Sequence, residues 1–230
     1  GNTKYHLRDY QGAIADYNKA IEINPHAYAY AYNNRGFVKD ELGNIQGAIA
    51  DYNKAIEINP QYANSYYNRG NAKNKSGDYQ GAIADYNKAI EINPQDASAY
   101  TNRCGAKLNL GNNNDAINDC NKALGIDPKL AIAYYNRGNV KSNLNDYKGA
   151  IRDFHKAITQ NPKYADAFIG RGAAWYEIKG YRYAVSDYSQ AIEINPQYAD
   201  AYNNRGFVKD ELKDYQGAIA DYTKAIEINP

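Results

Sequence analysis

The sequence feature that most constrains the fold is a period of 34 residues. The ending AIEINP, or a close variant of it, recurs at seven prolines: Pro25, Pro60, Pro94, Pro128, Pro162, Pro196 and Pro230. Successive prolines lie 35 residues apart once and 34 residues apart five times. A fixed period of this length predicts an array of similar supersecondary units, each packing against its neighbours rather than around one central core.

The unit is clearest in residues 63–94. Residues 63–75 suit an α-helix, and Ser-Gly-Asp at 76–78 predicts a turn, because glycine adopts backbone conformations that other residues avoid. A second helix is predicted for residues 79–92, and Asn93-Pro94 ends it, since proline disfavours helix in the residue before it. The second helix carries a narrow apolar stripe made of Ala82, Tyr86 and Ala89. Each unit is therefore predicted to be a helical hairpin.

This pattern resembles the tetratricopeptide repeat, which combines a 34-residue period with an aromatic, a glycine, two alanines flanking an aromatic, and a proline. The matching positions are Tyr66, Gly70, Ala82, Tyr86, Ala89 and Pro94, and they return along essentially the whole chain. The resemblance implies an all-α fold, an α-α superhelix or solenoid of about seven helix-turn-helix repeats with the first helices lining a concave groove. We expect one solenoid over residues 1–230, with a partial repeat at 1–25 followed by repeats at 26–60, 61–94, 95–128, 129–162, 163–196 and 197–230.

Charge and hydropathy exclude some classes of protein. The 27 basic and 26 acidic residues leave a net charge of +1, so nucleic acid is an unlikely partner. No apolar run approaches the ~18 residues of a membrane span, and no membrane association is expected. Because Gly1 falls inside a repeat and the chain has no methionine, we interpret the sequence as a fragment. Missing targeting signals say little in a fragment, so the location of the protein is undetermined, with the cytoplasm slightly favoured.

Two charged columns distinguish this chain from the usual repeat pattern. An arginine precedes the repeat glycine, and an aspartate follows that arginine 16 residues later. The arginines are Arg35, Arg69, Arg103, Arg137, Arg171 and Arg205, and the aspartates are Asp51, Asp85, Asp119, Asp153, Asp187 and Asp221. The one-to-one ratio favours a structural ladder of ion pairs, in which Arg137 would meet Asp153 or a neighbouring repeat's aspartate. The alternative is a positive groove for phosphates or carboxylates.

The resemblance places ligand contacts on the first helices. The candidate groove residues are asparagines and aromatics, which suit contact with a peptide backbone. They are Asn33, Asn34, Phe37, Tyr67, Asn68, Asn71, Asn102, Tyr135, Asn136, Asn139, Tyr176, Asn203, Asn204 and Phe207, with Asp40 and Asn74 on the same faces. The lysines of the clamp that binds chaperone C-termini are missing, because Asn64, Ser98, Ile132, Asp166 and Asp200 stand at one of its positions.

Catalysis finds no support in the sequence. His6, His26 and His155 occupy unrelated positions in different repeats, so they indicate neither a metal site nor a histidine-based dyad. No glycine-rich phosphate loop occurs. We therefore expect no enzymatic activity, no cofactor and no bound metal.

Repeats four and six depart most from the pattern. Repeat four has Cys104 at the glycine and Cys120 at the aromatic, which predicts neighbouring sulfurs, as a disulfide or, favoured in a cytosolic protein, as two reduced thiols. Repeat six has Trp175 where the other repeats have lysine.

The sequence thus predicts a non-enzymatic scaffold that binds a peptide or a helix of a protein partner in its groove. One alternative is a structural solenoid that stacks head to tail, because Ile219, Tyr222 and Ile226 would lie near an uncovered end. A second alternative is RNA binding through tyrosine stacking and the basic columns.

Overall fold

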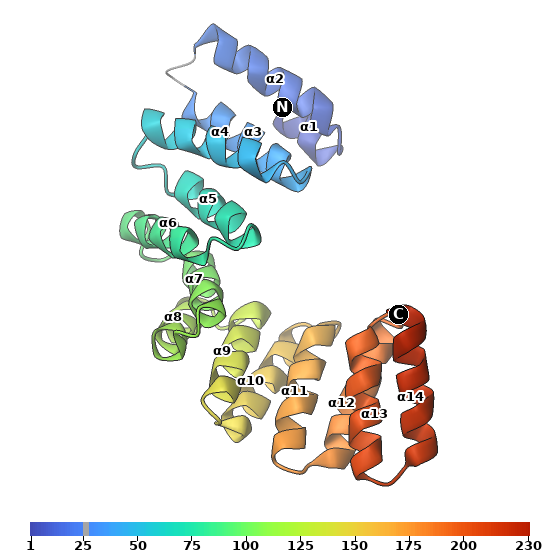
Figure 1. Cartoon of the computed structure of the whole chain (residues 1–230). Helices are drawn as coiled ribbons and strands as arrows, with labels where there is room; N and C mark the ends of the chain where they lie inside the picture. Colours follow the sequence, from blue (N-terminus) through green and yellow to red (C-terminus); the bar gives the residue numbers. More distant parts are fainter. Residues whose placement is uncertain (25–27) are drawn as a thin grey trace. The chain divides into compact units, whose positions relative to one another are not determined.

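The regular secondary structure of the described residues, 1–24 and 28–230, is entirely α-helical in the computed structural model (Figure 1). The fourteen helices of these residues follow one another as helical hairpins, which confirms the all-α class and the repeat architecture. The chain divides into two units, residues 1–112 and 113–230.

The first unit contains the helices that Figure 1 draws from blue to green. They are α1 (Asn2–His6), α2 (Tyr10–Ile23), α3 (Ala29–Glu41), α4 (Ile45–Ile58), α5 (Ala63–Lys75), α6 (Tyr79–Ile92) and α7 (Ala97–Asn109). The bounds of α5 and α6 are those expected from the sequence. The extra residue of repeat two precedes Ala29, because α3 keeps 13 residues, as α5 does. Residues 25–27, which include His26, lie outside the described part of the chain.

The second unit contains the remaining hairpins. Its helices are α8 (Asn113–Ile126), α9 (Ala131–Asn143), α10 (Tyr147–Gln160), α11 (Ala165–Glu177), α12 (Tyr181–Ile194), α13 (Ala199–Glu211) and α14 (Tyr215–Ile228). In both units the first helix of a full hairpin has 13 residues and the second has 14, as in α5 and α6 or in α11 and α12.

A residue in the left-handed region ends most first helices. Gly77 has φ +83° and no atom near the place of a Cβ, so glycine suits this turn. Gly43 and Gly111 share the conformation, whereas Arg8, Asn145, Lys179 and Lys213 adopt it without being glycine. A side chain in this region strains the backbone.

A carboxylate caps most second helices. Asp78 accepts a hydrogen bond from the backbone N–H of Gly81 at 2.9 Å. A Cβ on Gly81 would lie 2.1 Å from the Asp78 carboxylate, so this cap requires glycine at position 81. The same arrangement recurs at Asp9, Asn44, Asp146 and Asp214. In α12 no side chain makes this cap, because Gly180 replaces the aspartate, and Tyr183 replaces the glycine.

The core lies where each second helix packs against the next first helix. Ala82 and Tyr86 of α6 are buried with Ala106 of α7, and Ala150 and Phe154 of α10 are buried with Ala174 of α11. The repeat glycine makes room for the ring, because a Cβ on Gly70 would lie 2.7 Å from Tyr86. The predicted apolar stripe is therefore the core.

The two cysteines are buried, Cys104 in α7 and Cys120 in α8. Neither is a free thiol. The expectation of two reduced thiols is therefore wrong for this structure.

Candidate functional site

The first-helix face of the first unit carries a hollow of about 330 Å³. We use "first-helix face" for the surface of α3, α5 and α7 in the first unit, and for that of α9, α11 and α13 in the second. The hollow is lined only by first helices, through Phe37, Asp40, Glu41, Asn71, Asn74, Lys75 and Asn102. A smaller hollow of about 190 Å³ beside it is lined by Asn34 and Phe37 together with residues of α1 and α2. Sequence reasoning had placed four of these side chains, Asn34, Phe37, Asn71 and Asn102, among the groove candidates.

Several candidate asparagines bond to one another across neighbouring first helices. The Asn102 amide donates to Asn71 Oδ1 at 2.8 Å and to the Tyr67 hydroxyl at 3.1 Å. The Tyr86 hydroxyl also donates to Asn71 Oδ1, at 2.8 Å. These bonds hold the side-chain amides of Asn71 and Asn102 in fixed orientations.

Asn33 does not line the open surface. It is only 4% exposed, and its Oδ1 accepts from Ser65 Oγ and Asn68 Nδ2, both at 3.1 Å. Among its equivalents in the other repeats, Thr101 is buried as well, whereas Tyr67, Tyr135 and Ile169 are half-buried and Asn203 is exposed. Asn33 therefore joins α3 to α5 and is not available to a ligand.

Two buried acceptors in the larger hollow are left without a hydrogen bond. Asp40 Oδ1 and Asn74 Oδ1 have no partner among the described residues. Asp40 uses its other oxygen for Lys75 Nζ at 2.8 Å, so its carboxylate is oriented. A buried acceptor without a donor is costly, so these two oxygens stand out among the polar groups of the hollow.

Sequence reasoning missed Lys75. In the other repeats its column holds only histidine, acids or amides: His6, Glu41, Asn109, Asn143, Glu177 and Glu211. A lysine alone in such a column was a signal that could have identified it.

The first-helix face of the second unit is more aromatic. A hollow of about 190 Å³ is lined by Tyr176, Asn204 and Phe207, among others, with the Tyr176 and Phe207 rings 5.4 Å apart. Tyr135 lies 5.0 Å from the Tyr164 ring, and burial raises the pKa of Tyr135. Of the other candidates on this face, Asn203 is exposed, while Asn136 and Asn139 are half-buried.

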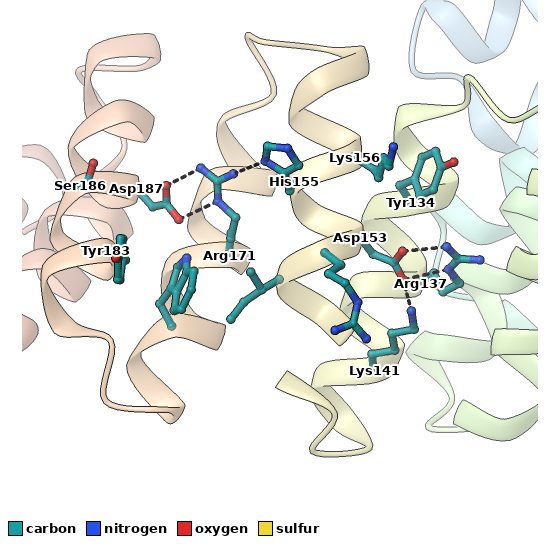
Figure 2. Close-up of a pocket in the computed structure, with 13 residues that line it drawn as sticks. Tyr134, Arg137, Lys141, Asp153, His155, Lys156, Arg171, Tyr183, Ser186 and Asp187 are labelled. Carbon is teal, nitrogen blue, oxygen red and sulfur yellow. Dashed lines mark hydrogen bonds and ion pairs between the residues drawn. The ribbon is translucent and has the colours of Figure 1, made fainter. Parts of the chain in front are cut away.

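A second face of each unit carries the charged columns. In Figure 2 the Arg137 guanidinium donates to both oxygens of Asp153, at 2.8 and 2.7 Å, and Lys141 contacts the same carboxylate at 2.6 Å. The third nitrogen of Arg137 donates to Asn121 of the preceding hairpin at 2.7 Å. One arginine thus ties three helices together, with an expected role in setting register.

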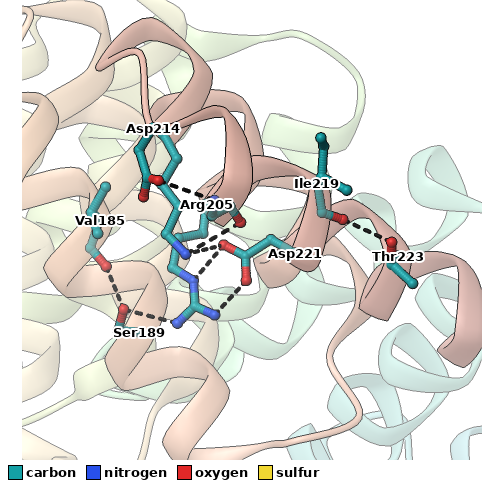
Figure 3. Close-up of polar contacts among 9 residues, drawn as sticks. Val185, Ser189, Arg205, Asp214, Ile219, Asp221 and Thr223 are labelled. Carbon is teal, nitrogen blue, oxygen red and sulfur yellow. Dashed lines mark hydrogen bonds and ion pairs between the residues drawn. The ribbon is translucent and has the colours of Figure 1, made fainter.

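Repeats six and seven vary this arrangement. Arg171 holds Asp187 at 2.7 and 2.8 Å and turns its remaining nitrogen to His155 Nδ1 at 3.1 Å (Figure 2). Arg205 holds Asp221 in the same fork and donates to Ser189 at 3.0 Å (Figure 3). Burial alone would raise the pKa of Asp221, but hydrogen bonds from Arg205 and Lys209 outweigh it and lower that pKa.

The structure brings together five of the six predicted arginine–aspartate pairs within a unit: Arg35 with Asp51, Arg69 with Asp85, Arg137 with Asp153, Arg171 with Asp187 and Arg205 with Asp221. Arg103 and Asp119 belong to different units. Each arginine also lies 5.3–5.6 Å from the aromatic ring three residues before it. The forks of these five arginines are thus engaged by side chains of the chain itself.

Within residues 1–24 and 28–230, no three His, Cys, Asp or Glu side chains are grouped as a metal site would need. None of its helices has the length and apolarity to span a bilayer.

Family models match most of the chain. One tetratricopeptide repeat model matches residues 63–96, 131–164 and 199–230, and a second matches residues 1–26 and 97–130. A third, described as TPR repeat, matches residues 41–77 and 181–209. All describe the same kind of repeat, typically a non-enzymatic interaction scaffold, and none indicates a catalytic family. No curated protein matches the chain.

Solved structures with the same fold include MamA, with 28% identity and a TM-score of 0.63 over 69% of this chain and 93% of that one. YrrB, a TPR protein with an unusual peptide-binding site, has 24% identity and a TM-score of 0.64 over 80% of this chain and 95% of that one. A tetratricopeptide repeat protein from Parabacteroides merdae ATCC 43184 has 21% identity and a TM-score of 0.78 over 100% and 90%. From its period, its hairpins and these matches, the chain belongs to the tetratricopeptide repeat family.

Proposed function

We propose that the chain is a protein-interaction scaffold that binds an extended peptide segment on its first-helix face. The observation that carries this proposal is the pair of unpartnered acceptors, Asp40 Oδ1 and Asn74 Oδ1, in a hollow lined by three successive first helices. A peptide in extended conformation offers backbone N–H groups that would satisfy both acceptors.

The surroundings of these acceptors suit such a ligand. Phe37 supplies apolar contact area at one side of the hollow, and Asn71 and Asn102 are already fixed by their mutual hydrogen bond. Amides held in advance lose little freedom on binding, which favours affinity. The peptide-binding site of YrrB supports the choice of ligand class, as an analogy between similar folds.

The test is to select a binding peptide from a phage-displayed library and measure its Kd for three variants by calorimetry. Asn74→Ala should weaken binding about tenfold, because one buried hydrogen bond is lost. Phe37→Ala should weaken it through lost apolar contact. Gln80→Ala, which removes an exposed amide from the second helix α6, is the matched control and should leave Kd unchanged.

Two results would contradict the proposal. One is a selected peptide whose affinity ignores both Asn74→Ala and Phe37→Ala. The other is binding of single-stranded RNA that weakens steeply with salt and exceeds any peptide affinity, which would favour the RNA alternative.

Self-association is a second candidate, supported by the exposure of Ile219 and Ile226 on α14, at 58% and 65%. Head-to-tail stacking would cover these side chains. Sedimentation velocity of the wild type against Ile219→Lys tests it: concentration-dependent assembly lost in the variant supports stacking, and a monomer at all concentrations contradicts it.

A further inference from the structure

The largest cavity described in the second unit does not lie on the first-helix face. It measures about 750 Å³ and lies on the face of the charged columns, between the hairpins α9–α10 and α11–α12 (Figure 2). The Arg137–Asp153 and Arg171–Asp187 pairs form part of its wall.

Residues that depart from the repeat pattern gather at this cavity. Trp175 stands where every other repeat has lysine, and Tyr183 stands where five others have glycine. Arg152 replaces an alanine found in four others, and His155 replaces an asparagine found in four others. The other hairpins form without these side chains, so the scaffold does not need them. Their concentration at one cavity indicates a separate task.

Two of these residues form an aromatic wall. The Trp175 and Tyr183 rings stack with centroids 4.6 Å apart and planes at 27°. Tyr183 is 62% exposed, so this wall is open to contact from outside the hairpin. The change of the capping aspartate to Gly180 permits this wall, because a cap carboxylate here would occupy the place of the Tyr183 Cβ, as the Asp78–Gly81 pair shows.

The opposite side of the cavity carries free positive charge. Arg152 and Lys156 are exposed, lie four residues apart on α10, and have no hydrogen bond or ion pair to any described residue. In three other repeats the lysine equivalent to Lys156 pairs with a glutamate three residues later, as Lys88 does with Glu91 at 2.8 Å. At Lys156 that glutamate is replaced by Thr159.

The carboxylates in the cavity wall cannot neutralise this charge. Asp153 already receives Arg137 and Lys141, and Asp187 receives Arg171. Arg171 must donate to His155 Nδ1, since a guanidinium has no acceptor, and the imidazole proton is then on Nε2, which can donate to a ligand. The charged side chains without a partner, Arg152 and Lys156, and the Nε2–H of His155 are therefore donors.

We propose that this cavity is a second binding site, for an acidic segment of a partner protein. One aromatic or large aliphatic side chain of the segment would lie against the Trp175–Tyr183 wall, and flanking carboxylates would contact Arg152 and Lys156. A protein segment is favoured over a small nucleotide because exposed side chains form the walls, whereas small-molecule sites bury most of their ligand. This site is distinct from the first-helix face of the proposed function, so either one can fail alone.

The probe is the peptide acetyl-Asp-Glu-Phe-Glu-Asp-amide, titrated into the chain. Trp175 is the only tryptophan of the chain, so its fluorescence reports on this cavity. We expect a saturable change in emission that is absent with acetyl-Lys-Arg-Phe-Arg-Lys-amide and much weaker when alanine replaces the phenylalanine. The double variant Arg152→Ala, Lys156→Gln should weaken binding about tenfold at low salt, because two charge contacts are lost.

The variants are chosen from residues that other repeats already carry. Trp175→Lys restores the lysine that the other repeats have at this position. It should abolish binding in calorimetry while the helical circular dichroism is retained. Lys88→Gln, at the equivalent of Lys156 in α6, is the matched control and should leave affinity unchanged. The proposal is overturned if the wild type shows no saturable change, if the double variant binds as the wild type does, or if AMP binds at this cavity more tightly than the peptide.

Discussion

The hairpins α5–α6 and α11–α12 have helices of the same lengths, 13 and 14 residues, but differ in three local features. In α5–α6, Asp85 is held by Arg69 and Lys73, whereas in α11–α12 Asp187 has only Arg171 because Trp175 replaces the lysine. The cap Asp78 becomes Gly180, and the turn residue Gly77, with φ +83°, becomes Lys179, with φ 61°. The first two changes each remove a local stabilising contact, and the third places a side chain in a strained backbone conformation.

The comparison shows what the repeat array tolerates. Both hairpins bury the same kind of core, with Tyr86 and Tyr188 against the repeat glycine of the first helix. Packing against neighbouring hairpins therefore maintains α11–α12 without the aspartate cap, the turn glycine and the lysine ion pair. At α11–α12 the same changes leave room for the aromatic wall of the cavity.

The largest expected effect comes from removing the arginine of the hairpin that lacks the second ion-pair partner, the lysine replaced by Trp175. Arg171→Leu should destabilise by about 3–5 kcal/mol, because Asp187, whose side chain is 7% exposed, would lose its ion-pair partner. Arg69→Leu should cost only about 1–3 kcal/mol, since Lys73 stays on Asp85. Urea denaturation of both variants measures the difference.

A double-mutant cycle gives the control. In the Trp175→Lys background a lysine can reach Asp187, so Arg171→Leu should cost about 1–2 kcal/mol less than in the wild type. If Arg69→Leu and Arg171→Leu lower the unfolding free energy equally in all backgrounds, the lysine at the position of Lys73 does not stabilise the aspartate.

The pH dependence of stability tests the arrangement in which both an arginine and a lysine hold the aspartate, as Arg205 and Lys209 hold Asp221. The pKa of Asp221 is lowered in the folded chain, so the unfolded chain binds the proton more readily. The stabilisation is complete above the unfolded pKa of about 4 and is lost as pH falls through the lower folded value. We expect Asp221→Asn to flatten the dependence of the unfolding free energy on pH below about 4, by up to one proton. An unchanged slope would contradict this.

The cap difference predicts a smaller effect. Asp78→Ala should destabilise by about 1 kcal/mol, because the Gly81 N–H loses its acceptor. Gly180→Asp should bring no gain in the wild type, where Tyr183 carries a Cβ and a Cβ at residue 180 would lie 2.8 Å from Trp175 Cε3. In the Trp175→Lys, Tyr183→Gly background it should gain about 1 kcal/mol. Thermal unfolding of the wild type and of this background, each with and without Gly180→Asp, distinguishes coupled from independent behaviour.

The turn difference predicts the smallest effect. Lys179→Gly should stabilise by about 0.5–1 kcal/mol, because glycine adopts the left-handed conformation without strain. Gly77→Lys should lose a similar amount, also about 0.5–1 kcal/mol. If both substitutions have the same sign, the left-handed residue is not what distinguishes these turns.

Most of the fold follows from the sequence because its determinants are local and repeated. The proline endings, the turn residues and the apolar stripe of Tyr86 act within one hairpin, and neighbour packing copies the result along the chain. For the same reason the pairing of Arg137 with Asp153 could be anticipated from the spacing of the two columns.

Only the tertiary structure decided which polar groups are left for a ligand. Asn33 is buried although its column suggested exposure, and Asp40 Oδ1 and Asn74 Oδ1 lack partners because of where neighbouring helices place their own side chains. The cavity joins Arg152 and Trp175, which lie in different repeats and whose proximity no single repeat reveals. Sequence columns define what each hairpin can form by itself, whereas hydrogen-bond satisfaction and open space arise only when hairpins stack, because both depend on atoms from several helices at once.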